Sequence, residues 1–153
     1  MTRTPAQLAT QLVEAFGRPD DIVTVLAEDA TWWITPTIPP EIMQNVSTGR
    51  DVIHGNMQRV FSLLYKGETM KTTVHSAISE GSLGTVRFTL TGEFPNGGDY
   101  TNEYCVCVET RGDEIIKIWE YVDAAHAVVQ MQAAGIDIAP AGAPASTSGS
   151  TTT

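Results

Sequence analysis

Up to Gly67, apolar residues recur three and four positions apart, which is typical of helices with one buried face. Thr4-Pro5-Ala6-Gln7 has the form of a capping box and predicts a first helix, which ends at Gly17. A short second helix is expected from Pro19 to about Ala27. A third helix is expected to begin after an N-cap at Thr48.

Two non-helical segments lie between the second and third helices. Thr31-Trp32-Trp33-Ile34 predicts a short strand, because prolines at positions 36, 39 and 40 prevent its continuation. Residues 35–48 are expected to form a long loop. Loops of this length in compact domains are often lids or binding loops.

After Gly67 the pattern alternates between apolar and polar residues, which is typical of strands with one buried face. The predicted strands are Met70–Ser79, Leu83–Thr91, Tyr100–Glu109 and Glu114–Val122. Asp123 is expected to cap a short last helix. Helices followed by a strand meander indicate an α+β domain, with the helices on one face of a curved antiparallel sheet.

Beyond Gly135 the sequence is dominated by Ala, Pro, Ser, Gly and Thr, a composition that cannot bury a core. We therefore expect one domain, residues 1–134, followed by a disordered tail, residues 135–153. Removal of residues 137–153 is expected to leave the thermal stability almost unchanged, since nothing large follows Ile138.

Composition narrows the choice of partners. A chain of 153 residues, 42% of them hydrophobic, suits a single core, and the net charge of −9 argues against nucleic acid or anionic membranes as partners. With no apolar run near the ~20 residues of a membrane helix and no signal segment, we expect a cytoplasmic protein. Cys105 and Cys107 are expected to be reduced and inert, and no Cys or His spacing predicts a metal site.

Glu120 is the most informative residue of the chain. Alternation in the last predicted strand places it on the same face as Ile116, Ile118 and Val122. A carboxylate on an apolar face is costly to bury without a partner. The strand therefore predicts a cavity in which this acid is used.

Four short segments resemble the SnoaL-like branch of the nuclear-transport-factor-2-like superfamily, a branch that includes polyketide cyclases. They are residues 22–32 (IVTVLAEDATW), 49–53 (GRDVI), 102–104 (NEY) and 120–123 (EYVD). The resemblance covers roughly residues 4–132. It implies a cone-shaped curved sheet wrapped around three N-terminal helices, an apolar pocket, and a homodimer built on the outer face of the sheet.

Known activities of this fold do not transfer directly. Ketosteroid isomerases carry an aspartate base where this chain has Ile34, and a tyrosine where it has Leu12 or Val13. Limonene-epoxide hydrolases have a water-binding asparagine at the position of Ile34, and an Arg-x-Asp pair where residues 87–89 offer no acid. One family position is retained, since the acid of the last strand falls at Glu120.

The residues that face Glu120 depend on the register of the last hairpin. A three-residue loop at 110–112 sets Asn102 opposite Glu120. A two-residue Arg111-Gly112 turn would set Glu103 there, where two like charges would repel. We adopt the first register, in which Asn102, Tyr104 and Glu120 converge. The other residues expected to line the cavity are Trp32, Ile34, Met57, Phe61, Ile118 and Val122.

Two functions fit this constellation. In the first, a cofactor-free enzyme of the cyclase, isomerase, dehydratase or hydrolase type acts by proton transfer on a small hydrophobic ring-bearing molecule. Burial would raise the pKa of Glu120 toward neutrality, and Tyr104 would donate to a carbonyl or enolate oxygen. In the second, Glu120 is held by Asn102 or a helix end, and the domain binds a ligand or a partner without chemistry.

The remaining polar candidates are interpreted as structural. His54 is expected to be a half-buried helix residue, His75 to lie on the sheet surface, and His126 to cap or pack the last helix. Arg87 alternates with threonines, which indicates a polar sheet surface, although it would also suit an anionic substrate group.

With Glu120 inward, the other face of the same strand points outward. It carries Lys117, Trp119 and Tyr121. An exposed aromatic patch of this kind usually marks an interface, and a homodimer through this face is expected.

Overall fold

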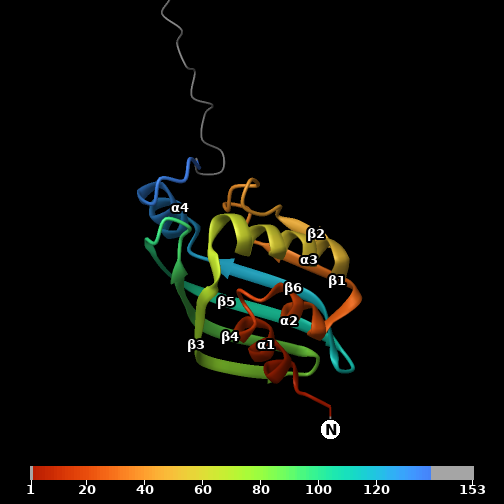
Figure 1. Cartoon of the computed structure of the whole chain (residues 1–153). Helices are drawn as coiled ribbons and strands as arrows, with labels where there is room; N and C mark the ends of the chain where they lie inside the picture. Colours follow the sequence, from red (N-terminus) through yellow and green to blue (C-terminus); the bar gives the residue numbers. More distant parts are fainter. Residues whose placement is uncertain (1, 139–153) are drawn as a thin grey trace, which may run out of the picture.

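We describe the fold from a computed structural model of the chain, which describes residues 2–138. The elements, in order, are α1 (Pro5–Glu14), α2 (Pro19–Ile22), the 3-10 turn η1 (Val23–Val25), β1 (Leu26–Ile34), β2 (Val46–Thr48), α3 (Arg50–Arg59), the π-helical turn η2 (Val60–Leu64), β3 (Lys66–Glu80), β4 (Leu83–Glu93), β5 (Asp99–Arg111), β6 (Glu114–Val122) and α4 (Ala124–Ala133) (Figure 1).

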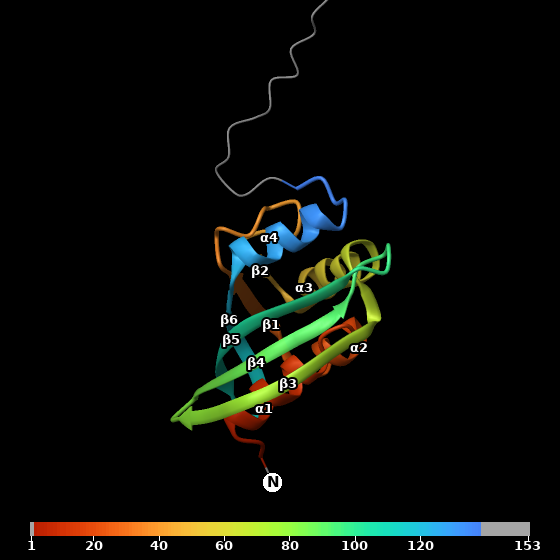
Figure 2. The same cartoon turned by 90° about the vertical axis from the view of Figure 1, so that its left-hand side faces the viewer.

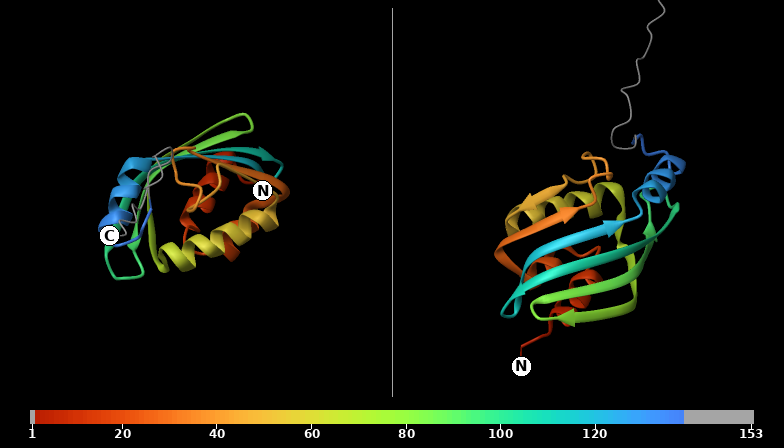
Figure 3. Two further views of the ribbon diagram at one scale, coloured as in Figure 1. Left: turned by 90° about the horizontal axis from the view of Figure 1, so that it is seen from above. Right: turned by 180° about the vertical axis from the view of Figure 1, so that it is seen from behind.

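The strands form one curved, unclosed sheet in the order β2-β1-β6-β5-β4-β3. α1, α2 and α3 lie against its concave face, whereas no helix covers the opposite face (Figure 3). The predicted α+β architecture is confirmed. The structure adds a parallel pairing of β1 with β6 within the otherwise antiparallel sheet. No local sequence pattern predicts this pairing, because β1 and β6 are far apart in the chain, with α3 and the strands β3, β4 and β5 between them.

The start of the domain follows the predicted local chemistry. The Thr4 hydroxyl accepts from the Gln7 backbone N–H, and the Gln7 side chain accepts from the Thr4 N–H, so the predicted capping box is present. Leu8 and Leu12 are fully buried on the face of α1 that packs against β3 and β4. The first helix is thereby seated on the sheet.

Two predicted boundaries are wrong between the second and third helices. β1 begins at Leu26 rather than Thr31, because the chain after η1 already pairs with β6 at Leu26 and Ile115. Thr48 does not cap α3. It belongs to β2, and Gly49, with φ 94°, occupies the N-cap position without a side-chain bond. In both places strand pairing overrides the local helical pattern.

α4 and the β1–β2 connection lie at the same end of the molecule, as Figure 2 shows. Asp123 caps α4 as predicted, accepting from the His126 backbone N–H. After α4, Ile136 packs against the core and Ile138 is buried. Residues 135–138, the first part of the expected disordered tail 135–153, therefore lie against the domain, and residues 139–153 lie outside the described residues. None of the helices described here is long and apolar enough to cross a membrane.

Candidate functional site

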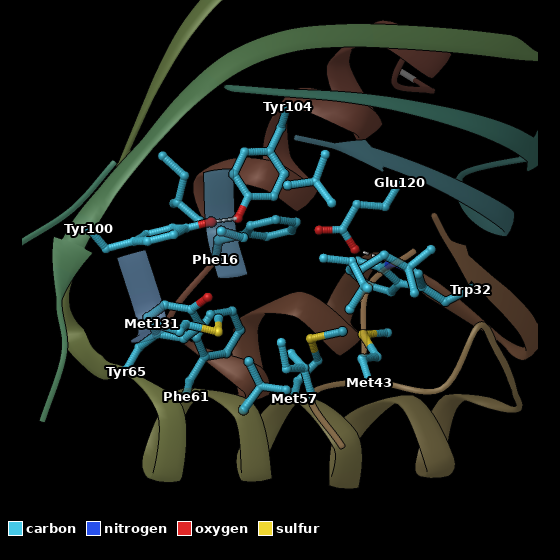
Figure 4. Close-up of a pocket in the computed structure, with 17 residues that line it drawn as sticks. Phe16, Trp32, Met43, Met57, Phe61, Tyr65, Tyr100, Tyr104, Glu120 and Met131 are labelled. Atoms are coloured by element: carbon cyan, nitrogen blue, oxygen red, sulfur yellow. Dashed lines mark hydrogen bonds between the residues drawn. The ribbon is translucent and has the colours of Figure 1, made fainter. Parts of the chain in front are cut away.

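A pocket lies between the concave face of the sheet, the α3–η2 helix, α4 and the β1–β2 connection (Figure 4). Its cavity measures about 50 Å³. Of the predicted lining, Trp32, Ile34, Met57, Phe61, Tyr104, Glu120 and Val122 line this pocket. Two predicted residues do not. Ile118 is buried in the core beside the pocket, and Asn102 points elsewhere.

Among the described residues, Glu120 is the only carboxyl group in the lining, and it is 6% exposed. The alternation of β6 turns it inward, as predicted. Trp32 on β1 donates its indole N–H to Oε2 of Glu120 over 2.8 Å. The other carboxyl oxygen points into the pocket, toward the Tyr104 and Tyr100 hydroxyls (Figure 4). Trp32 is thus the hydrogen-bond partner of the acid as well as part of the wall.

The surroundings of Glu120 shift its pKa toward neutral pH. Burial raises its pKa to about 7, because the low-dielectric pocket disfavours the charged form, while the Trp32 hydrogen bond acts in the opposite direction. A group with this pKa can both take and give a proton near neutral pH.

Tyr104 and Tyr100 supply a second polar centre. Both come from β5, on the same face of the strand, and their hydroxyl oxygens lie 2.5 Å apart. Tyr65, at the end of η2, packs its ring 4.9 Å from that of Tyr100. Burial raises the pKa of Tyr104 and of Tyr65 well above the ordinary value, and that of Tyr100 less, so all three phenols remain protonated donors.

Tyr100 and Tyr65 were absent from the predicted site. The alternation that selects Asn102 and Tyr104 also selects Tyr100, which was the signal available for it. In the sequence Tyr65 follows Phe61 by four residues, a spacing that places two residues on one face of a continuous helix, whereas in the structure Tyr65 comes just after η2 with extended backbone. The π-helical turn η2 between them lies at the pocket wall, a frequent location for such turns.

The predicted register of the last hairpin is wrong. β5 and β6 are joined by a two-residue turn, Gly112-Asp113, with Arg111 paired to Glu114. Gly112 has φ 61°, the positive value that the first central position of a type I′ or II′ turn requires. An irregularity then follows at Ile116, so that Ile115, which strict alternation from Glu120 would turn outward, is fully buried.

As a result, Val106 rather than Asn102 stands opposite Glu120. The Asn102 side-chain amide donates to the Asp123 carbonyl over 2.9 Å, and its oxygen accepts from the Glu103 N–H. Asn102 therefore holds the junction of β6 and α4. The shift preserves the parity of the strand, so Tyr104 still faces inward.

Within residues 2–138, no Lys, Arg or His lines the pocket. His54 bonds to Asp20 at 2.7 Å on the helical side, and His75 bonds to Thr89 at 2.7 Å on the sheet surface, where Arg87 is also exposed. Over residues 2–138, no three His, Cys, Asp or Glu side chains are grouped to hold a metal ion. The site can therefore donate and exchange protons, and its lining offers a ligand no positive charge.

The sequence of the chain matches a known domain family. The SnoaL-like domain family matches residues 9–121. No curated protein matches the chain in sequence.

Solved structures share the fold at low identity. A hypothetical protein from Catenulispora acidiphila with a ketosteroid-isomerase-like fold, in complex with trimethylamine, matches with TM-score 0.68 and 20% identity, over 85% of this chain and 95% of its own. IdmH from Streptomyces antibioticus, a proposed polyketide cyclase, matches with TM-score 0.67 and 19% identity, over 85% and 99%. TerC, co-crystallized with polyporic acid, matches with TM-score 0.71 and 14% identity, over 84% and 99%.

Proposed function

The chain belongs to the SnoaL-like family, and on that premise we propose that it acts as a cofactor-free acid/base enzyme on a small, neutral, ring-bearing molecule. The observation that carries the proposal is Glu120. It is a carboxyl group buried in an apolar pocket, with a pKa of about 7 and one oxygen free toward the cavity. A group poised in this way suits proton transfer at neutral pH.

The proposed chemistry needs only groups of this pocket. Ionised Glu120 takes a proton from the carbon next to a ligand carbonyl, and the electron pair of the broken C–H bond moves onto the carbonyl oxygen. In the hydrogen-bonded pair of Tyr104 and Tyr100, one hydroxyl donates to the other, and the second hydroxyl donates to the resulting enolate oxygen. With a β,γ-unsaturated ketone, protonated Glu120 then returns the proton to the γ carbon of the dienolate, which is an isomerisation. With a second carbonyl in the ligand, the enolate carbon attacks that carbonyl carbon, and the carbonyl oxygen takes the proton from Glu120 as the ring closes.

The class of ligand is inferred from the lining. Aromatic and aliphatic side chains suit a ring, and the absence of Lys, Arg and His from the lining favours a neutral molecule over a carboxylate. IdmH, a proposed polyketide cyclase, and TerC, crystallised with polyporic acid, are compatible with this class. At their identities the likeness concerns the fold, so the ligand class rests on the pocket itself.

Exchange of carbon-bound protons tests the proposal without knowledge of the natural substrate. 2-Tetralone, a neutral bicyclic ketone, is incubated in D₂O with the protein, and loss of its α-proton signals is followed by NMR. The wild type is expected to accelerate exchange, and Glu120→Gln to lose about 100-fold or more of the acceleration. Glu103→Gln, which changes an exposed carboxylate, is the matched control and should retain it. Equal rates for wild type and Glu120→Gln would contradict an acid/base role.

A binding module is the second candidate. Two features favour this candidate: the small cavity, and the hydrogen bond from the Trp32 indole N–H to Glu120. A buried carboxyl group that already has a hydrogen-bond partner can serve a structural role alone. A module of this kind would retain a ligand through purification, detectable by mass spectrometry. It would gain thermal stability from that ligand, while showing no exchange above the Glu120→Gln background.

A further inference from the structure

Residues 36–44 of the β1–β2 connection form one wall of the pocket. This segment consists only of turns and irregular backbone. Three of its side chains, Ile38, Ile42 and Met43, are 6%, 5% and 4% exposed and line the pocket. The wall on this side is therefore supplied by a segment without a helix or strand of its own.

The base of the segment is fastened to the sheet. Ile34 and Asn45 bond across it, through the Ile34 N–H to the Asn45 carbonyl over 2.9 Å and the Asn45 amide to the Ile34 carbonyl over 2.6 Å. The Thr35 N–H donates to the Glu120 carbonyl over 3.1 Å. These bonds hold both ends of the segment and leave its middle to be held by other contacts.

Arg59, the last residue of α3, holds the middle. Its guanidinium donates to the Glu41 carbonyl over 2.8 Å and to the Ile42 carbonyl over 2.6 Å. Within residues 2–138 these are the only hydrogen bonds from another element to residues 36–44. The planar fork of arginine suits two neighbouring carbonyls, a geometry that lysine cannot reproduce.

The cavity beneath this segment is too small for a ring-bearing ligand. Its volume of about 50 Å³ holds about three or four water molecules. On the proposed function, a ring must enter the pocket, so part of the wall has to move. Residues 36–44 are the part of the wall whose middle is held from outside by a single side chain.

We propose that Arg59 is a positioning residue that fastens residues 36–44 over the pocket and thereby controls how fast a ligand enters and leaves. This inference rests on the proposed function for the identity of the ligand, whereas the fastening itself is a property of the free protein. Loss of both guanidinium bonds frees the middle of the segment, while its base remains attached to β1 and β6.

Hydrogen exchange tests the fastening without any ligand. In Arg59→Gln, the backbone amides of Ile38, Ile42 and Met43 are expected to exchange at least about tenfold faster, with the central strands unchanged. Arg50→Gln is the matched control, since Arg50 lies on the same helix and donates to the distant Leu26 carbonyl. Unchanged exchange in residues 36–44, or a uniform rise over the sheet, would overturn the inference. If Arg59→Gln does not fold, Arg59→Lys is measured in its place, with a smaller rise confined to the same amides.

Binding kinetics give the second readout. Stopped-flow fluorescence with N-phenyl-1-naphthylamine, a neutral apolar probe, should show faster association and faster dissociation in Arg59→Gln than in wild type. Identical rates for the two proteins would refute control by Arg59 while leaving the proposed function intact. If the wild type binds no probe, ligand binding is what fails, and the hydrogen-exchange result still decides the role of Arg59.

Discussion

At the scale of single residues, burial of Glu120 lowers the stability of the fold at neutral pH and also gives this group a pKa suited to proton transfer. The group is buried, and its pKa of about 7 lies above the value of 4.5 for an unperturbed glutamate. The folded protein therefore binds a proton more tightly at this site than the unfolded chain does. Stability from this difference is present in full at low pH and is lost as the pH rises to the folded pKa.

Replacement of Glu120 by glutamine tests this pH-dependent contribution to stability. Relative to Glu120→Gln, the wild type should lose about 3 kcal/mol of unfolding free energy between about pH 4.5 and pH 7 and little more above it. The amide oxygen can still accept from Trp32, so the fold is retained. Urea denaturation at a series of pH values measures the difference. A variant less stable than wild type at pH 7, but equal to it at pH 4, would mean that the carboxylate is an ionised structural partner.

At the scale of elements, the space around two glycines shows how closely helices pack against their surroundings. In Gly84 on β4, an added Cβ would lie 2.5 Å from the backbone C and O of Pro5, at the start of α1. In Gly55 within α3, an added Cβ would meet nothing within 4 Å. One glycine permits close packing of a helix on the sheet, whereas the other only loosens a helix.

The two alanine substitutions should therefore have opposite effects. Gly55→Ala is expected to stabilise the domain by about 0.5–1 kcal/mol, because alanine favours the helix and restricts the unfolded chain. Gly84→Ala is expected to destabilise it by about 1–3 kcal/mol or more, because the start of α1 must shift. Thermal denaturation of both variants against wild type measures this. A neutral Gly84→Ala would contradict the close approach of α1 to β4.

At the scale of the whole molecule, the face of the sheet that no described helix covers carries an aromatic patch. Lys117, Trp119 and Tyr121 lie on this face, as expected once Glu120 faces inward. Trp33 joins them through its pairing with Trp119, and its ring lies 5.1 Å from that of Tyr121. Tyr121 and Val46 are each 49% exposed, so apolar surface is open to solvent across β6, β1 and β2.

We propose that a second copy of the chain covers this face. The Lys117 ammonium lies 3.2 Å from the Glu109 carboxylate beside the aromatic patch, so these two charges are paired within the chain and the apolar patch can face its own copy across a two-fold axis. Sedimentation at micromolar concentration should give a dimer for wild type and a monomer for Trp119→Asp. Val129→Asp, at a position 62% exposed on α4, is the control and should remain dimeric. A monomeric wild type would refute the proposal.

Local chemistry was sufficient for much of the fold. The capping box at Thr4, the four meander strands and the inward position of Glu120 all depend on neighbours within a few residues, or on the period of a single strand. Such features are decided by backbone geometry and by which side chains avoid water. They determined the α+β class, the acid and the aromatic patch on the outer face.

Only the tertiary structure decided what surrounds the acid. The partner of Glu120 across the sheet depends on a turn at Gly112, and a two-residue turn in place of a three-residue loop moved Asn102 away and left Val106 opposite. The packing of the Tyr65 ring on Tyr100 depends on the direction in which the chain leaves the π-helical turn η2. The parallel pairing of β1 with β6, which brings the Trp32 indole to the carboxyl group, joins segments 88 positions apart. Contacts over such separations depend on turn geometry and packing summed over the whole chain, which the local pattern of apolar and polar residues does not contain.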